Sequence, residues 1–273
     1  MKFILILILI IFLIFFININ EYFENNNLSY KIAIITSIYG NYDNLKEHHI
    51  NNKNKVDWYC FTDNNIQSDF WTIINTPYHI NNMNNEHNEY NNYYNNINED
   101  DIKNMMSAKY YKINPHEIDI LQNYDYYIWI DGSIILQQEF INNVLSIINN
   151  NHKLINFKHH KRNNIKEELN DSLTINKYIN KGLENQYNEY IADNFPDNIG
   201  LFENGIIIRK NDNNINKVFD EWWIHNLKYS YQDQISYPYV LWKHNLLPDY
   251  IINENIFYNN NYSYIDYSLL QNH

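Results

Sequence analysis

The stretch Tyr124–Leu136, YDYYIWIDGSIIL, decides the fold class of this 273-residue chain. Its aromatic and branched run Tyr126–Ile130 has no polar alternation, which is typical of a strand buried on both faces of a sheet. Asp131 ends the run, although burying an unpaired carboxylate is costly. Gly132 and Ser133 follow and indicate a turn. The sequence therefore predicts a central strand whose carboxyl end presents an acid, either as a turn cap or as a ligand for a cation.

Further short apolar runs end in polar or glycine-containing turns, as expected for other strands of the same sheet. Segments with helical periodicity separate them. Strands that alternate with helices predict an α/β fold with a mainly parallel sheet flanked by helices. In such sheets, ligands bind beyond the carboxyl ends of the strands. The other predicted strands are 31–40, 56–64, 153–157 and 205–212, and the predicted helices are 105–112, 139–150, 165–191 and, as a pair, 216–247.

Asparagine is so frequent, at 54 residues, that local asparagine runs carry little meaning. Residues 79–104 are almost devoid of aliphatic side chains, which predicts an inserted loop. We expect the histidines of this loop, His79 and His87, to be solvated and not to bind metal. Glycine is rare, and four of the five glycines fall in strand-edge motifs, where a ligand or a tight turn is expected.

An apolar segment opens the chain, because Phe3–Ile17 contains only Ile, Leu and Phe. As a helix it would span roughly 25 Å, close to the ~30 Å hydrocarbon core of a bilayer. No small-residue cleavage site follows, which favours a transmembrane signal anchor over a cleaved signal peptide or a buried element. Lys2 predicts a cytoplasmic N-terminus, and hence a single-pass type II protein of a Golgi-like or ER-like membrane, or one facing the exported side. The predicted division is anchor 1–19, stem 20–30, folded domain 31–250 and C-terminal tail 251–273.

Charge and cysteine content exclude some classes of function. The net charge is −12, and Lys158–Arg162 is the one basic block, so we expect no nucleic acid partner. Cys60 is the only cysteine, which excludes an intrachain disulfide and a cysteine-based zinc cluster.

Eight motifs, in order, carry a resemblance to a known family. Over roughly residues 31–245 the chain resembles glycosyltransferase domains of bacteria, large viruses and plants, whose plant members include mucilage-related Golgi proteins. That family is similar to nucleotide-sugar transferases of the GT-A type. The resemblance implies a GT-A-like fold, a nucleotide-sugar donor, a glycan or glycoconjugate acceptor, and Mn²⁺ or Mg²⁺ held by a strand-terminal acid. The motifs are ITSIYGNYDNL, VDWYCFTDN, SAKYYKINPHEI, YDYYIWIDGSI, KHHKRNNIKEEL, ENGIIIRKN, EWW and YSYQDQISYPYVLWK.

The resemblance also implies a set of site residues. Asp131 matches the first acid of the metal motif, and Ser133 stands where a second acid is more common, so a second ligand must come from elsewhere, with His244 or Asp233 as guesses. Asp233 and Gln234 join Asp131 as predicted catalytic residues, with Asp233 as general base or sugar-hydroxyl ligand. The implied donor and acceptor contacts are Thr36, Tyr39 (stacking on the base), Asp43, Asp63, Lys109, Lys112, His159, Arg162, Glu168, Glu203 and Asn204.

Besides Ser133, two further positions depart from the family pattern. Lys109 replaces an arginine, which keeps the charge but loses the bidentate fork. Gln232 also replaces an arginine and loses the charge. Besides the transferase, three interpretations stay open: a catalytically inactive glycan-binding domain, a ceramidase-like lipid amide hydrolase, and a structural surface protein.

Overall fold

The computed structural model describes residues 30–48, 50–51, 55–77, 99–178, 182–253 and 263–265. The predicted anchor 1–19, nearly all of the stem and most of the loop 79–104 lie outside the described residues. Within the described part, no helix is long and apolar enough to cross a membrane.

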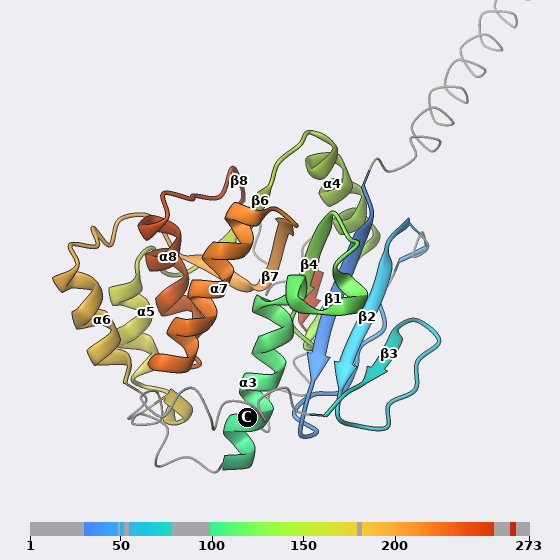
Figure 1. Cartoon of the computed structure of the whole chain (residues 1–273), viewed down its shortest axis with the longest axis horizontal. Helices are drawn as coiled ribbons and strands as arrows, with labels where there is room; N and C mark the ends of the chain where they lie inside the picture. Colours follow the sequence, from blue (N-terminus) through green and yellow to red (C-terminus); the bar gives the residue numbers. More distant parts are fainter. Residues whose placement is uncertain are drawn as a thin grey trace, which may run out of the picture. The chain divides into compact units, whose positions relative to one another are not determined.

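A seven-stranded sheet in the order β3-β2-β1-β4-β7-β6-β8 forms the centre of the fold (Figure 1). All neighbouring pairs are parallel except those of β7, which is antiparallel to both β4 and β6. A mixed α/β fold with a mostly parallel sheet is therefore confirmed. The strands are β1 Ile32–Ile38, β2 Asp57–Thr62, β3 Thr72–Asn75, β4 Tyr126–Ile130, β6 Leu154–Lys158, β7 Phe202–Lys210 and β8 Tyr250–Ile252, while β5 Ile134–Leu136 pairs separately with β9 Ser263–Ile265.

The strand that ends at Asp131 lies at the middle of this sheet. β4 is fourth of seven, and all five of its residues are buried. Ala33 of β1 and Tyr127 of β4 belong to a core cluster on one face, together with aromatic residues of α3 and α8. Their neighbours Ile34 and Ile128 point to the opposite face and are also fully buried. Both faces are covered, which explains the absence of polar alternation.

Six described helices flank the sheet. α3 packs on β1, and α8 packs on β7 and on α7 (Figure 1). α5 and α7 begin at asparagine and aspartate N-caps, Asn164 and Asp212, whose side chains accept backbone N–H groups. The helices are α3 Glu99–Ile113, α4 Gln138–Asn149, α5 Ile165–Ser172, α6 Leu183–Ala192, α7 Asn213–Lys228 and α8 Asp233–Lys243.

The structure corrects several predicted boundaries. α3 begins at Glu99, inside the predicted loop 79–104, because Ile102 and Met105 pack on a small core cluster with Met106. The predicted single helix 165–191 is two helices, and Gly182 takes a left-handed φ of +73° where α6 begins. Strand β3 was not predicted, since it is only four residues long and partly exposed.

The predicted end of the folded domain at residue 250 is also too early. It falls inside β8, which pairs in parallel with β6, so the sheet continues into the predicted tail. The pairing of β9 with β5 adds a second contact from beyond residue 250.

The antiparallel direction of β7 shapes the edge of the sheet where ligands are expected. The carboxyl ends of β1, β4 and β6 lie at one edge, because these strands run in the same direction. β7 runs the other way, so its first residues, Phe202 and Glu203, pair with the last residues of β6. Side chains from three strand ends and one strand start therefore meet at one edge.

Candidate functional site

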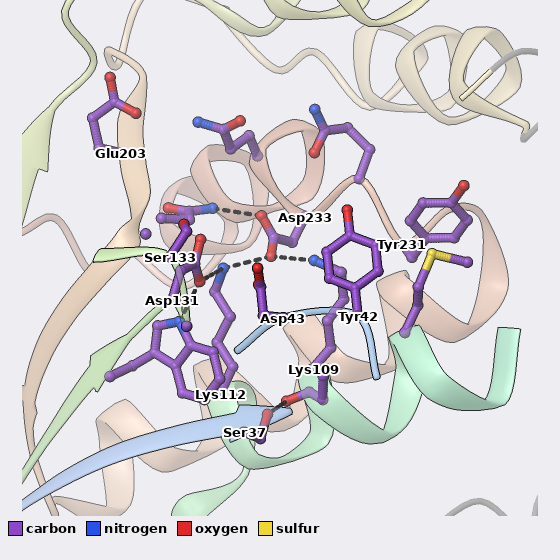
Figure 2. A pocket seen from close by; sticks show the side chains of 18 of the residues that line it. Ser37, Tyr42, Asp43, Lys109, Lys112, Asp131, Ser133, Glu203, Tyr231 and Asp233 are labelled. Carbon is purple, nitrogen blue, oxygen red and sulfur yellow. Dashed lines mark hydrogen bonds and ion pairs between the residues drawn. The ribbon is translucent and has the colours of Figure 1, made fainter. Parts of the chain in front are cut away.

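A cavity of about 650 Å³ opens at this edge of the sheet (Figure 2). Of the predicted site residues, all but Thr36, Asp63 and Glu168 line it. It also takes in residues that the sequence did not single out as site residues, among them Ser37, Tyr42, His160, Lys161, Tyr178 and Tyr231. The cavity therefore unites segments that are far apart in the sequence.

Asp131 lies in the cavity wall with its backbone tied on both sides. Its N–H donates to the carbonyl of Gly205 at 2.8 Å, and its own carbonyl accepts the N–H of Ile134 at 3.0 Å. The indole Nε1 of Trp129 donates to Oδ1 of Asp131 at 2.7 Å. The side chain is nonetheless 43% exposed. The backbone of Asp131 closes the turn, and its carboxylate stays accessible, so the two interpretations of this acid are compatible.

A second carboxylate stands beside Asp131, although residue 133 is a serine. A Cβ added at Gly132 would lie 3.4 Å from Oδ2 of Asp43, so the loop after β1 brings this acid against the turn (Figure 2). Carboxylate oxygens with open positions are the donor set that Mg²⁺ and Mn²⁺ prefer. Asp131 and Asp43 are therefore the candidate ligands for a divalent cation, and this role stays a prediction.

Two lysines of α3 converge on one acid of α8. Oδ2 of Asp233 lies 2.6 Å from Nζ of Lys109 and 2.8 Å from Nζ of Lys112. The amide of Asn204 donates to the other oxygen, Oδ1, at 3.1 Å. Lys112 also reaches to 3.7 Å from Oδ1 of Asp131. Figure 2 shows this charge cluster at the centre of the cavity.

The charge cluster argues against the predicted role of Asp233 as a general base. Burial by itself would raise the pKa of Asp233, but Lys109 and Lys112 hold it well below its usual range. Burial lowers the pKa of Lys109, while Asp233 and Asp131 raise that of Lys112 despite its burial. A general base needs a pKa near the working pH. We conclude that Asp233 stays ionised and orients the two ammonium groups.

A pair of stacked histidines follows β6. Nδ1 of His159 accepts the backbone N–H groups of Lys161 and Arg162, and burial lowers the pKa of His159 to about 3. Nδ1 of His160 is hydrogen-bonded to Oε1 of Glu203, whose pKa is raised by burial. His159, His160 and Glu203 lie close enough together for a metal. However, hydrogen bonds already occupy Nδ1 of both rings, so we assign no metal to this group.

Glu168 was predicted to bind substrate, but it lies behind the cavity wall. One oxygen of Glu168 accepts a hydrogen bond from Nε of Arg162 at 2.6 Å, and the other accepts one from Nε2 of Gln232 at 2.8 Å. Gln232 thus keeps a partner although it lacks the arginine charge. The guessed metal ligand His244 is wrong, because it pairs with Glu221 outside the cavity.

The first motif also needs correction. The ring of Tyr39 is buried in the core and stacked on Tyr111 at 6.0 Å, so it presents no face to a nucleobase. Thr36 is buried within β1. The carboxylate of Asp63 accepts the N–H of Gly40 at 3.1 and 3.3 Å and stabilises the turn after β1.

The residues that sequence reasoning missed differ in how visible they were. Tyr42 and His160 stand in the same motifs as the predicted Asp43 and His159, so a wider choice within each motif would have included them. Tyr231 likewise stands in the motif of the predicted Asp233 and Gln234. Tyr178 carries no local signal, because only the packing of η6 (Asn176–Tyr178) beside Tyr231 brings it to the cavity.

Comparison with known families agrees with this geometry. A family model described as the TOD1/MUCI70 glycosyltransferase-like domain matches residues 17–270, which is most of the chain. No curated protein matches it. The resemblance carried by the eight motifs is thereby confirmed, and the chain belongs to the TOD1/MUCI70 glycosyltransferase-like domain family.

Proposed function

We propose that this protein is a GT-A-like glycosyltransferase, which moves a sugar from a nucleoside diphosphate donor to an acceptor hydroxyl. The observation that carries the proposal is the pair of α3 ammonium groups held beside Asp131 in the cavity. Family membership supports the transferase class.

The two lysines suit a departing diphosphate, whose negative charge grows as the bond to the sugar breaks. Each ammonium group has three N–H donors. Asp233 accepts one donor from Lys109 and one from Lys112, and Asp131 is near a second donor of Lys112. The remaining donors can bind phosphate oxygens. Because Asp233 fixes both lysines beforehand, the site needs little rearrangement when charge develops.

Asp131 and Asp43 are the residues that would hold a Mn²⁺ or Mg²⁺ ion. When bound, such an ion supplies positive charge against the donor diphosphate. The chain's own contribution is to place both carboxylates in the lining of the cavity that also holds the two lysines. Trp129 fixes the rotamer of Asp131 through its indole N–H.

The polar residues at the β6 side of the cavity suit sugar hydroxyl groups. His160 and Arg162 come from the segment after β6, and Gln234 from the first turn of α8. The amide of Gln234 donates to the carbonyl of Phe202 at 3.2 Å, which leaves its Oε1 as an acceptor. These groups are our candidates for contacts to the transferred sugar and to a glycan or glycoconjugate acceptor.

We further propose that the protein is a single-pass type II membrane protein whose domain faces a Golgi-like or ER-like lumen or the exported side. The proposal rests on the apolar segment Phe3–Ile17. Carbonate extraction and protease protection of the full-length protein in microsomes test it. Release by carbonate, or digestion of the domain in sealed vesicles, would contradict it.

Donor hydrolysis and transfer by the purified full-length protein test the main proposal. We expect one or more sugar nucleotides to be hydrolysed, and Lys112→Met to lower the rate by about 10². Asp249→Asn, which changes an acid outside the cavity, is the matched control. Binding without turnover would favour the inactive glycan-binding alternative. Absence of both binding and turnover would reject the transferase.

A lipid amide hydrolase is less well supported. Such an enzyme needs a metal-bound water or an equivalent nucleophile. Within the described residues of the cavity, the histidine group that could hold such a metal is His159, His160 and Glu203, and Nδ1 of both rings is engaged in hydrogen bonds.

A further inference from the structure

The cavity has two chemically different ends, separated by the charge cluster. Figure 2 shows Tyr42 and Tyr231 on one side of Lys109 and Asp233, and Glu203 on the opposite side. A nucleoside diphosphate donor has the same division, with a flat base at one end, charged phosphates in the middle and a hydroxyl-rich sugar at the other end.

Tyr42 supplies a flat surface at the first end. It is 50% exposed although it lines the cavity, whereas Tyr39 of the same motif is buried. Hydrogen bonds hold the loop that carries Tyr42. The N–H of Tyr42 donates to the carbonyl of Tyr39 at 3.2 Å. Gly40 takes a φ of +62°, and its N–H donates to the carboxylate of Asp63.

Other side chains extend this surface. The rings of Tyr178 and Tyr231 lie 5.6 Å apart between centroids, and both residues line the cavity. Burial raises the pKa of Tyr231 to about 12, with a further contribution from Tyr42 nearby. The phenol of Tyr231 therefore stays neutral at physiological pH, which suits an uncharged aromatic ligand. Met105 adds a polarisable side chain to the same wall.

The second end offers hydrogen bonds. Nδ1 of His160 is hydrogen-bonded to Glu203, so the other ring nitrogen of His160 points away from that acid. Arg162 and Gln234 also line the cavity, with Arg162 in contact with His159 and Gln234 hydrogen-bonded to Phe202 at the start of β7. Such groups match hydroxyls better than they match a flat base, because each unpaired hydroxyl of a buried sugar would lose its hydrogen bonds to water.

We propose that Tyr42 is the stacking platform for the nucleobase of a nucleoside diphosphate. The base lies against Tyr42 and the diphosphate against Lys109 and Lys112, so that the attached sugar points toward His160 and Glu203. The assignment rests on the proposed transferase function and adds the direction in which the donor lies. It also moves the predicted stacking role from Tyr39 to Tyr42.

Binding of nucleoside diphosphates and of inorganic pyrophosphate to the full-length protein tests the assignment by calorimetry. UDP, GDP, CDP and ADP have a base, and pyrophosphate has none. We expect Tyr42→Ala to weaken the best nucleoside diphosphate about tenfold and to leave pyrophosphate unchanged, because base stacking on an aromatic side chain has roughly that effect. Tyr42→Phe keeps the ring and should bind like the wild type. Lys109→Gln should weaken both kinds of ligand.

Three results would overturn the assignment. An unchanged nucleoside diphosphate affinity in Tyr42→Ala would put the base elsewhere. Equal losses for pyrophosphate and nucleotide would mean that Tyr42 only shapes the loop. A raised acceptor KM with unchanged nucleotide affinity would make Tyr42 an acceptor-sugar platform. If Tyr42→Ala does not fold, Tyr42→Leu provides the same comparison.

The wild-type titration separates this inference from the proposed function. A wild-type protein that binds neither nucleotide nor pyrophosphate contradicts the transferase itself. A wild-type protein that binds nucleotide, with no preference over pyrophosphate, contradicts only the role of Tyr42.

Discussion

The two halves of the sheet hold their sides of the cavity by different means. On the side of β1, β2 and β4, the cavity wall depends on backbone turns: Gly40 with its positive φ, Asp63 on the N–H of Gly40, and the turn at Asp131. On the side of β6, β7 and α8, it depends on buried charged or titratable groups such as Asp233 and His159. The first side should therefore respond to added volume and backbone strain, and the second to changes of charge and pH.

The largest effect is expected from Asp233→Asn. This change removes the carboxylate that lies between Lys109 and Lys112, and breaking a buried ion pair typically costs about 3–5 kcal/mol. Since Lys109 is one-fifth exposed, we expect a loss of about 3 kcal/mol in the free energy of unfolding, measured by urea denaturation. Asp131→Asn on the other side is the control and should cost less than about 1 kcal/mol, because Asp131 is partly exposed. Equal losses would contradict the division between the two sides.

The ion pairs of Asp233 with the two lysines also make the stability of the fold depend on pH in the acid range. The folded pKa of Asp233 is depressed below its unfolded value of about 3.9, so its stabilising contribution is complete above that pH and is lost as the pH falls further. Asp233→Asn should therefore flatten the dependence of stability on pH below about 4. A curve parallel to that of the wild type in this range would show that Asp233 is not held by the lysines.

Gly40→Ala should have the next largest effect. An added Cβ would lie 2.0 Å from Nδ2 of Asn104, and alanine at positive φ costs about 1–2 kcal/mol before any clash. We expect a loss of about 2–3 kcal/mol in the free energy of unfolding. Asn104→Ala in the same chain should recover the steric part and leave the backbone part.

The matched control for Gly40→Ala is Gly132→Ala. Its added Cβ would be 3.4 Å from Asp43 and Ile38, and its φ is not in the left-handed region, so we expect less than about 1 kcal/mol. A larger loss at Gly132 than at Gly40 would reverse the assignment of the strained turn.

The pH dependence of stability that His159 causes tests the side of β6, β7 and α8. Its folded pKa of about 3 lies below the unfolded value of about 6.5, so the unfolded chain binds a proton that the folded chain excludes. The free energy of unfolding should fall as the pH drops from about 6.5, by up to about 1.4 kcal/mol per unit for this residue. His159→Asn keeps an acceptor near the position of Nδ1 but cannot titrate, so it should reduce the slope by about one proton. Gly40→Ala should keep the wild-type slope, and a reduced slope in that variant would contradict the comparison.

The smallest effect is expected from Asp63→Asn. The amide keeps one acceptor for the N–H of Gly40 but loses the charge, which should lower stability by about 1 kcal/mol. Nucleotide affinity should change little, because Asp63 lies outside the cavity wall. A loss of affinity without a loss of melting temperature would restore Asp63 as a nucleoside contact.

Most of the regular elements could be predicted from the sequence, because each strand is a short apolar run that ends in a turn. β4 is the clearest case, since burial on both faces removes polar alternation. β3 could not be found in this way, because a short, partly exposed edge strand lacks that pattern. The break between α5 and α6 was missed because the surrounding polar residues continue a helical composition, and Gly182 alone marks the new start.

The candidate site shows the same limit. Asp131 and Asp43 could be placed in the cavity from the sequence, because each follows a strand whose carboxyl end had to lie at the ligand edge. Their roles stay predictions. The sequence also pointed to Asp233 and Lys109, but it assigned them to substrate and not to each other.

By itself, the sequence determined the α/β class, the central strand and the kinds of groups at the ends of the strands, because periodicity and turn residues act over a few positions. Only the tertiary structure decided which groups neutralise one another. Lys109 and Asp233 are 124 positions apart, and Glu203 reaches His160 only because β7 runs antiparallel beside β6. Electrostatic and hydrogen-bond energies depend on distance in space, and local patterns in a sequence carry no information about that distance.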